Sequence, residues 1–385
     1  MELVSRNIAP ELSQLATQYP VVTITGPRQS GKTTLARTVF PDKPYFNLEN
    51  PDTRQIIQSD PRSFFNSNRE GAIIDEFQKL PEILSYIQGI VDEKKMNGQF
   101  ILTGSNQLSM LSSLTQSLAG RTALLTLLPF SFDELSQMGE LPSTDGLLYQ
   151  GFYPGVYANQ LNATKAYRNY YETYIERDVR QLSAIQHLSQ FQLFIKLCAG
   201  RVGQLFNASN LANEVGVSIP TIKHWISVLQ ATYIVFLLQP WHTNVNKRLV
   251  KTPKLYFYDP GLASYLLGIE SQNQIATHPL RGALFENMVV VELIKSRFNN
   301  GLSNNFYFYR DNHNNEVDLV QEQGHLLNVF EIKSSMTFHP DFLKGINYLK
   351  KLTSQKIQKS FLIYAGNDDF VTQESQVLNY SRLIQ

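Results

Sequence analysis

The sequence predicts an α/β protein in which a parallel sheet wrapped by helices is followed by a helical module and a second α/β domain. Three observations predict this organisation. Short apolar stretches alternate with helix-forming stretches over the first 130 residues. Two short amphipathic helices around a glycine follow in the middle of the chain, and two apolar strands flank a turn in its C-terminal part.

The first strand leads into a glycine-rich loop. The apolar, β-branched run 21–25 is followed by the pattern G-x-x-x-x-G-K-T and then by helix-forming residues. A phosphate-binding P-loop requires this order, because its glycines let backbone N–H groups and the helix N-terminus face the phosphates. We therefore expect a bound nucleotide, ATP or GTP, rather than a chance glycine loop. The residues expected to hold it are Gly26, Pro27, Arg28, Gln29, Ser30, Gly31, Lys32, Thr33 and Thr34.

Lys32 and Thr33 have the chemistry that catalysis at such a loop needs. The Lys32 ammonium would reach the β and γ phosphates, and the Thr33 hydroxyl would hold Mg²⁺. A second apolar strand, 72–76, ends in two acids. Asp75 would hold Mg²⁺ through water, and Glu76 would polarise the attacking water. The alternative is a strand that meets a solvated turn, but the preceding P-loop favours an ATPase site.

Polar and basic residues beyond these strands are further candidates. After the strand 100–103, Ser105 or Asn106 is expected to bond the γ-phosphate or the attacking water, unless it only closes a turn. Arg121 is a candidate catalytic arginine finger that would reach the nucleotide of a neighbouring subunit, and Arg177 is a rival for this role. A finger that acts in this way implies a homo-oligomer.

The stretch 129–190 is rich in Tyr, Leu and Gln, with breaks at Gly151 and Pro154. We expect it to form a helical lid over the nucleotide, and we expect its tyrosines to pack in the core rather than to stack on bases.

The stretch 207–229 has the pattern of a helix-turn-helix. A short helix, a turn at Gly216 and a Ser-capped second helix carry apolar residues every three or four positions. No Asp or Glu occurs over 215–258, whereas five lysines and arginines do, and phosphate contact requires such a locally basic surface. DNA contact is therefore one expectation, and a protein-interaction or packing module is the other. The residues expected to contact DNA are Lys223, His224 and the basic segment 247–254.

Two strands in the C-terminal part carry a candidate metal site. The stretches 316–320 and 328–334 flank a turn and are expected to pair as a hairpin. Glu331 and Lys333 point to the same face of their strand, and Asp318 can lie beside them. Asp318 and Glu331 would bind Mg²⁺ through oxygen, and Lys333 would orient or deprotonate a water that attacks a phosphodiester. The alternative is a surface ion pair without function.

In this order, the motifs resemble a large family of prokaryotic AAA-type ATPases. The N-terminal part of the resemblance rests on GPRQSGKTTL (26–35), IDE (74–76), LTGS (102–105) and LAGR (118–121). The motifs YIERD (174–178) and PKLYFYDPGL (253–262) resemble that family's C-terminal domain of unknown function. The resemblance implies ATP binding and hydrolysis, with a winged helix followed by a restriction-endonuclease-like fold. The D…E-x-K arrangement is similar to the PD-(D/E)xK nuclease site, with Glu286 in the place of its helper acid.

Composition limits the remaining choices. A chain of 385 residues should hold two or three domains, which we place at 1–190, 191–255 and 256–385. The net charge of +1 gives no global attraction to nucleic acid, so any such surface must be local. A single cysteine, Cys198, and the lack of an apolar run long enough for a membrane span predict a cytoplasmic protein. The seven histidines lack metal-ligand spacing.

The leading hypothesis is a Mg²⁺-dependent ATPase that couples hydrolysis to work on DNA through the winged helix and the nuclease-like domain. One alternative is an ATP-gated switch that holds a protein partner and has an inactive nuclease-like domain. The other alternative is a nuclease that ATP regulates.

Overall fold

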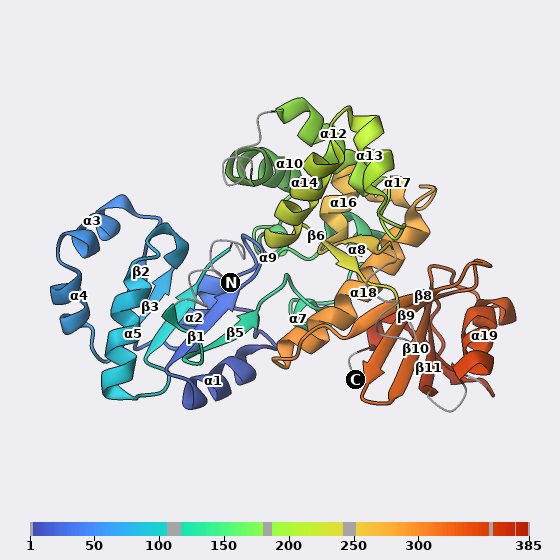
Figure 1. Cartoon of the computed structure of the whole chain (residues 1–385). Helices are drawn as coiled ribbons and strands as arrows, with labels where there is room; N and C mark the ends of the chain where they lie inside the picture. The colour runs from blue at the N-terminus through green and yellow to red at the C-terminus, as the bar shows by residue number, and fades with distance from the viewer. Residues whose placement is uncertain are drawn as a thin grey trace. The chain divides into compact units, whose positions relative to one another are not determined.

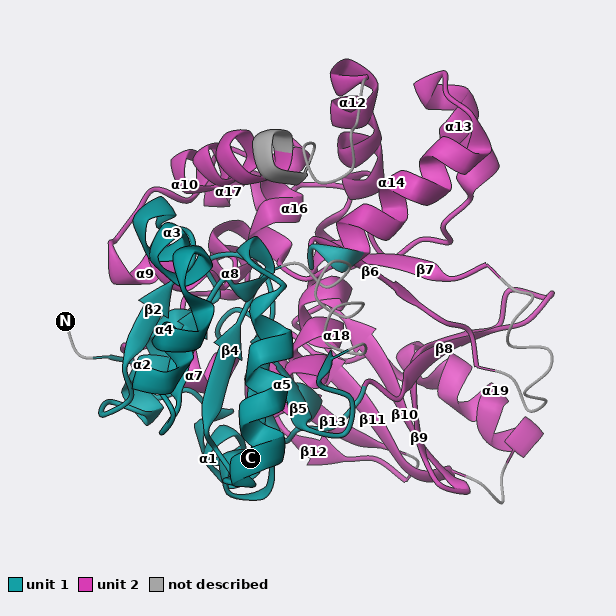
Figure 2. Ribbon diagram, turned by 60° about the vertical axis from the view of Figure 1, so that its left-hand side comes forward, with its two compact units in different colours: residues 1–130, 231–233, 297–303 teal, residues 131–230, 234–296, 304–385 magenta. Residues whose placement is uncertain are grey.

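The structure is a computed structural model that describes residues 3–105, 117–179, 187–241, 252–353, 357–373 and 375–383. Side chains are described over the same ranges, except at 176–179. The chain forms two compact units, shown in different colours in Figure 2. Unit 1 consists of residues 1–130, 231–233 and 297–303, and unit 2 consists of 131–230, 234–296 and 304–385.

Unit 1 is built around a parallel five-stranded sheet (Figure 1). Its strands are β1 (Val21–Thr25), β2 (Tyr45–Asn47), β3 (Ala72–Asp75), β4 (Phe100–Thr103) and β5 (Thr122–Thr126). They lie in the order β2-β3-β4-β1-β5, and every neighbouring pair is parallel. The predicted parallel α/β class is therefore confirmed. One strand, β4, lies between the P-loop strand β1 and the acidic strand β3.

Helices cover both faces of this sheet. They are α1 (Ala9–Gln18), α2 (Lys32–Val39), α3 (Pro51–Ser59), α4 (Pro61–Ser67), the 3-10 turn η1 (Phe77–Lys79) and α5 (Ile83–Lys94). Side chains of β1, β3 and β4 are buried along their whole length, because successive residues enter opposite cores. On β3, for example, Ile73 packs with α1 and α2, whereas Ile74 packs with α3, α4 and α5.

The first part of unit 2 is mostly helical. Its elements are α7 (Phe132–Ser136), α8 (Thr144–Gln150), α9 (Pro154–Ala158), α10 (Ala163–Tyr170), the π-helical stretch η2 (Tyr171–Val179), α12 (Leu188–Ala199), α13 (Ala208–Val215), α14 (Ile219–Ala231), β6 (Val235–Leu238), β7 (Lys254–Phe257), α16 (Pro260–Leu266), α17 (Gln272–Ile275) and α18 (Arg281–Asn299). Of the stretch 129–190, expected as a lid over the nucleotide, residues 131–190 belong to unit 2 and not to unit 1. The domain boundaries at 190 and 255 stay a prediction.

The expected pair of short helices lies at α13 and α14. Gly216 takes the left-handed conformation (φ 75°) that ends α13, and the Ser218 hydroxyl accepts a hydrogen bond from Thr221 N (3.2 Å) at the start of α14. β6 and β7 then pair in antiparallel fashion. The predicted basic residues Lys247, Arg248 and Lys251 lie outside the described residues.

The second part of unit 2 is a six-stranded sheet in the order β12-β13-β11-β10-β9-β8. Its elements are β8 (Phe306–Arg310), β9 (Glu316–Gln323), β10 (Leu326–Lys333), η3 (Pro340–Leu343), α19 (Lys344–Thr353), β11 (Ile357–Tyr364), β12 (Phe370–Val371), β13 (Gln376–Asn379) and η4 (Tyr380–Arg382). β9 and β10 are antiparallel and joined by a tight turn, so the predicted hairpin is confirmed. Across the described ranges, no helix is long and apolar enough to cross a membrane.

Candidate functional site

The loop between β1 and α2 has the backbone shape of a phosphate cradle. Gly26 and Gly31 have φ angles of 142° and 93°, which favour glycine, and Gln29 is also left-handed (φ 64°). A Cβ atom on Gly26 would lie 2.1 Å from the carbonyl oxygen of Leu127. Gly31 is the N-cap of α2 and offers no side chain to cap it, so the first N–H groups of the helix are left to bind an anion.

Lys32 folds back over this loop. Its Nζ donates to the carbonyl oxygens of Gly26 (3.1 Å) and Pro27 (2.7 Å), and only 5% of the residue is exposed. Burial lowers the pKa of Lys32 to about 8, although the nearby carboxylates of Glu76 and Asp75 oppose this shift. The Lys32 ammonium therefore lies over the loop that starts α2, and its predicted contact with phosphate oxygens stays a prediction.

Asp75 is held by three hydroxyl groups. Its Oδ2 accepts hydrogen bonds from Thr33 Oγ1 (2.9 Å) and Tyr45 Oη (2.8 Å), and its Oδ1 accepts one from Thr103 Oγ1. Burial and the hydrogen bond to Asp75 raise the pKa of the Tyr45 phenol well above its usual value. The structure thus brings together Thr33 and Asp75, the two residues expected to hold Mg²⁺, at the carboxyl end of β3.

Glu76 lies directly beyond this group. Its backbone is left-handed (φ 55°), and its carboxylate accepts hydrogen bonds from Ser105 Oγ (3.1 Å) and from the Gln78 amide. Burial raises the pKa of Glu76, and the charge of Asp75 adds to this shift while Lys32 opposes it. Ser105 therefore lies at this site, where it donates a hydrogen bond to Glu76, the predicted base. Its predicted alternative, Asn106, lies outside the described residues.

Arg6 supports the loop through hydrogen bonds to its backbone, and no local sequence pattern identifies this role. Its guanidinium donates to the carbonyl oxygens of Ser30 (2.7 Å) and Leu128 (2.6 Å) and lies 5.1 Å from the centre of the Phe130 ring. Tyr45 and Thr103 were also missed. Both lie on strands next to β3, so a strand order would have been needed to place them beside Asp75.

The predicted arginines have local partners. Arg121 forms a two-pronged ion pair with Asp92 (2.6 and 2.9 Å), and Arg28 pairs with Glu49 (3.0 Å). The side chain of Arg177 lies outside the described residues. An arginine finger that acts between subunits stays a prediction.

Thr34 is exposed on α2, beside a surface depression of about 440 Å³. Thr33, Arg37, Lys43 and Tyr45 also line this depression. Of the predicted loop residues, Ser30 is fully buried, and no hydrogen bond to its hydroxyl is found within the described ranges.

The second predicted cluster assembles on the β9–β10 hairpin. Lys333 Nζ lies 2.6 Å from Glu331 Oε1 and 3.2 Å from Asp318 Oδ2, and the Ile332 N–H also donates to Asp318 Oδ2 (2.8 Å). Burial and the charge of Asp318 raise the pKa of Glu331 to about 8, against the effect of Lys333. Burial would lower the pKa of Lys333, but the two carboxylates outweigh it and raise that pKa above its usual value. Glu331 Oε2 is buried and has no hydrogen-bond partner among the described residues.

Glu286 lies in a second group of charged residues, with Lys254 and Glu316. The prediction that Lys254 contacts DNA is wrong. Lys254, expected to contact DNA phosphates, is 2% exposed. Its Nζ lies 3.1 Å from Glu286 Oε1 and 2.5 Å from Glu316 Oε1, and the Tyr256 hydroxyl also donates to Glu286. Two carboxylates bury and neutralise this lysine, so its charge is not available at the surface. Lys223 and His224, in contrast, are exposed on α14.

Neither site is a ready-made metal cage. Within the described part of the chain, no three His, Cys, Asp or Glu side chains cluster so as to hold a metal ion. Mg²⁺ does not require such a cage, because it keeps several waters and binds through one or two protein oxygens plus substrate phosphates. Thr33 with Asp75, beside the P-loop, fits that pattern.

Comparison with known proteins divides the chain into three parts. A family described as an AAA domain matches residues 18–136, and two families described as domains of unknown function, DUF8612 and DUF4143, match 142–273 and 281–383. The motifs at 174–178 and 253–262 were predicted to belong to the C-terminal domain of unknown function. They lie instead within the middle match.

Similar whole proteins carry no functional description. An uncharacterized protein of Mycobacterium tuberculosis is 29% identical over 377 residues, which are 97% of this chain and 82% of that protein. An uncharacterized protein of Haemophilus influenzae is 23% identical over 260 residues, which are 63% of this chain and 62% of that protein.

Two solved structures share parts of the arrangement. A Walker-type ATPase of Pyrococcus abyssi has a TM-score of 0.46 and 15% identity, covering 69% of this chain and 96% of that chain. AMPPCP-bound DnaA from Aquifex aeolicus has a TM-score of 0.32 and 14% identity, covering 58% of this chain and 85% of that chain. The fold assignment rests on the strand order and the loop geometry. With the family match over 18–136, these features show that the N-terminal part of this chain is an ATPase-like AAA domain, and its C-terminal part matches DUF4143.

Proposed function

We propose that this protein is a Mg²⁺-dependent ATPase. The observation that carries the proposal is the gathering of Lys32, Thr33, Asp75 and Glu76 around the uncapped N-terminus of α2. A phosphate-binding loop, two oxygens for a hard cation and a separate carboxylate next to them are the parts that nucleotide hydrolysis needs. The match of residues 18–136 to an AAA domain supports the same conclusion.

Each residue has a distinct task in this proposal. The N–H groups at the start of α2 and the Lys32 ammonium bind the phosphates, for which Lys32 exchanges its two loop carbonyls for phosphate oxygens. Thr33 and Asp75 would hold Mg²⁺, which when bound neutralises charge on the phosphates. Glu76, whose pKa is raised, accepts a proton from the attacking water, and Ser105 keeps its carboxylate in place.

The test is nucleotide binding and hydrolysis by the full chain. We expect Lys32→Ala to abolish ATP binding, because the loop then lacks the ammonium that lies over its Gly26 and Pro27 carbonyls and would bind the phosphates. Lys94→Ala is the matched control, since it removes a lysine from a surface pair with Glu70 in the same unit. ATP binding that is unchanged in Lys32→Ala would refute the P-loop assignment.

We further propose that hydrolysis is coupled to DNA through α13 and α14. The supporting features are the capped helix pair and the exposed Lys223 and His224 on α14. DNA should stimulate ATP hydrolysis, and the stimulation should weaken as salt rises and in Lys223→Glu, but not in the control Lys165→Glu on α10. A rate indifferent to DNA would favour the alternative, an ATP-gated switch that holds a protein partner.

A second candidate function is cleavage of a phosphodiester by the β9–β10 cluster, which ATP would regulate. Glu331 Oε2, which is buried and has no hydrogen-bond partner in the part of the chain that the structure describes, favours this function, since an acceptor without a donor is a place for a cation. Mg²⁺ or Mn²⁺ should then support DNA cleavage that Lys333→Ala removes. Cleavage that persists in that variant would point to a contaminating nuclease.

A further inference from the structure

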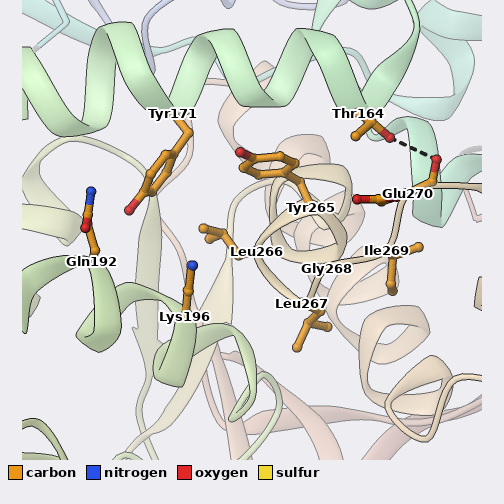
Figure 3. Close-up of a pocket in the computed structure, with 10 residues that line it drawn as sticks. All are labelled: Thr164, Tyr171, Gln192, Lys196, Tyr265, Leu266, Leu267, Gly268, Ile269 and Glu270. Carbon is orange, nitrogen blue, oxygen red and sulfur yellow. Dashed lines mark hydrogen bonds between the residues drawn. The ribbon is translucent and has the colours of Figure 1, made fainter. Parts of the chain in front are cut away.

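A pocket of about 420 Å³ opens in unit 2 between the end of α16 and the helices α10 and α12 (Figure 3). It shares no residue with the P-loop site or with the β9–β10 cluster. Its volume is within the range of about 300–1,000 Å³ typical of small-molecule sites. The residues that line it include Lys196, Glu270, Tyr171, Tyr265 and Leu266.

Two opposite charges face this pocket from different walls. Lys196 extends from α12, and the Glu270 carboxylate points toward Tyr265 from the segment after α16 (Figure 3). Among the described residues, neither side chain forms an ion pair or a side-chain hydrogen bond, and the two charges do not pair with each other. A ligand that enters here meets one positive and one negative group.

Three hydrogen bonds hold the backbone of Glu270 at the edge of the pocket, and its side chain is exposed there, as is that of Lys196. The carbonyl oxygen of Glu270 accepts hydrogen bonds from Tyr149 Oη and Thr164 Oγ1, both at 3.0 Å. Its N–H donates to Gln274 Oε1 at 2.6 Å. These three bonds connect Glu270 to α8, α10 and α17. The backbone of Lys196 is part of the helix α12.

Aromatic and apolar groups form the wall between the two charges. The rings of Tyr171 and Tyr265 lie 6.1 Å apart and are inclined by 51°, and Leu266 is buried beneath them. Tyrosine rings favour contact with flat apolar groups and with cations over their faces. The middle of the pocket therefore suits a flat, mainly apolar body.

We propose that this pocket binds a small zwitterion with a carboxylate and an ammonium group at opposite ends of a flat apolar body. The carboxylate pairs with Lys196, the ammonium pairs with Glu270, and the body rests on the two tyrosine rings. A ligand with only one charge leaves the other protein charge partly desolvated and unpaired. Tight binding therefore requires both charged groups of the ligand.

The test uses 4-(aminomethyl)benzoate as the probe, with benzoate and benzylamine as matched single-charge probes. Binding to the full chain is measured by titration calorimetry or by NMR. We expect 4-(aminomethyl)benzoate to bind about tenfold more tightly than either relative, which corresponds to about 1.4 kcal/mol. Absence of saturable binding by this probe, or equal affinity for all three probes, would overturn the proposal.

Substitutions of Lys196 and Glu270 test which charged group of the ligand each residue binds. In Lys196→Gln, the zwitterion should bind no more tightly than benzylamine. In Glu270→Gln, it should bind no more tightly than benzoate. The control Lys165→Gln on α10 should leave both differences in affinity unchanged. The double variant Lys196→Glu/Glu270→Lys keeps both charges on their walls and should recover zwitterion binding in the reversed orientation. If both single variants retain the full selectivity, the charges are solvated surface groups and the proposal is wrong.

Discussion

The P-loop site of unit 1 and the β9–β10 cluster of unit 2 use the same kinds of residue in opposite ways. At the P-loop, hydroxyl groups of Thr33, Tyr45 and Thr103 orient Asp75, and Lys32 is turned toward loop carbonyls. In the cluster, Lys333 bridges the two carboxylates directly. The first site therefore leaves its negative charge for a cation from outside, whereas the second carries its counter-charge within the chain.

This contrast shows that a pair of acids and a lysine does not by itself define a catalytic centre. What matters is whether neutral donors or a fixed cation satisfy the carboxylates. Neutral donors orient an acid without cancelling its charge, so Mg²⁺ still gains from binding there. A bridging ammonium must move before a metal can occupy the same oxygens.

Glu76→Gln should give the largest change. Because the amide cannot accept a proton, we expect ATP turnover to fall by about 100-fold or more while ATP binding is retained. Turnover and binding are measured on the same preparation, with Glu93→Gln, at an exposed carboxylate on α5 of the same unit, as the control. Turnover that matches the wild type would remove Glu76 from the chemistry.

Lys254→Met should destabilise unit 2. The substitution leaves the carboxylates of Glu286 and Glu316 without their buried cation, a change that typically costs about 3–5 kcal/mol of unfolding free energy. Chemical denaturation measures the loss. Arg201→Met, which breaks the more exposed pair with Glu214, should cost about 1 kcal/mol or less. Equal losses in the two variants would mean that Lys254 is not the internal counter-charge described here.

Lys333→Ala should tighten Mn²⁺ binding at the cluster. Removal of the ammonium frees Glu331 Oε1 and Asp318 Oδ2 and removes a like charge, for an expected gain of about tenfold in affinity. The binding is read by electron paramagnetic resonance, with the exposed Lys359→Ala as control. Weaker binding in Lys333→Ala would mean that the lysine assists the metal rather than replaces it.

Tyr45→Phe should have the smallest effect. It removes one of the hydroxyl donors that orient Asp75, so the Mg²⁺ concentration needed for half-maximal ATP turnover should rise by about three- to tenfold. The rate at saturating Mg²⁺ should stay close to that of the wild type. Tyr86→Phe, on α5, is the control. An unchanged Mg²⁺ requirement would show that Thr33 and Thr103 hold Asp75 without help.

Local patterns in the sequence predicted the strands, the P-loop and the hairpin, because each depends on neighbours a few residues apart. They also placed Asp75 beside Thr33, since both follow parallel strands at one edge of the sheet. The contacts that were missed join distant positions. Arg6 reaches Ser30 and Leu128, and the burial of Lys254 depends on Glu286 and Glu316. A count of basic residues cannot show that a lysine is already neutralised by acids elsewhere in the chain.

The Mg²⁺ dependence of ATP hydrolysis shows whether the P-loop site acts without the β9–β10 cluster. It is measured in the wild type and in the double variant Asp318→Asn/Glu331→Gln, with Lys32→Ala as the inactive reference. We predict hydrolysis that requires Mg²⁺ and is the same in the wild type and the double variant, because the P-loop site alone carries the chemistry. Hydrolysis without Mg²⁺, or its loss in the double variant, would mean that the P-loop site does not carry the chemistry in this way.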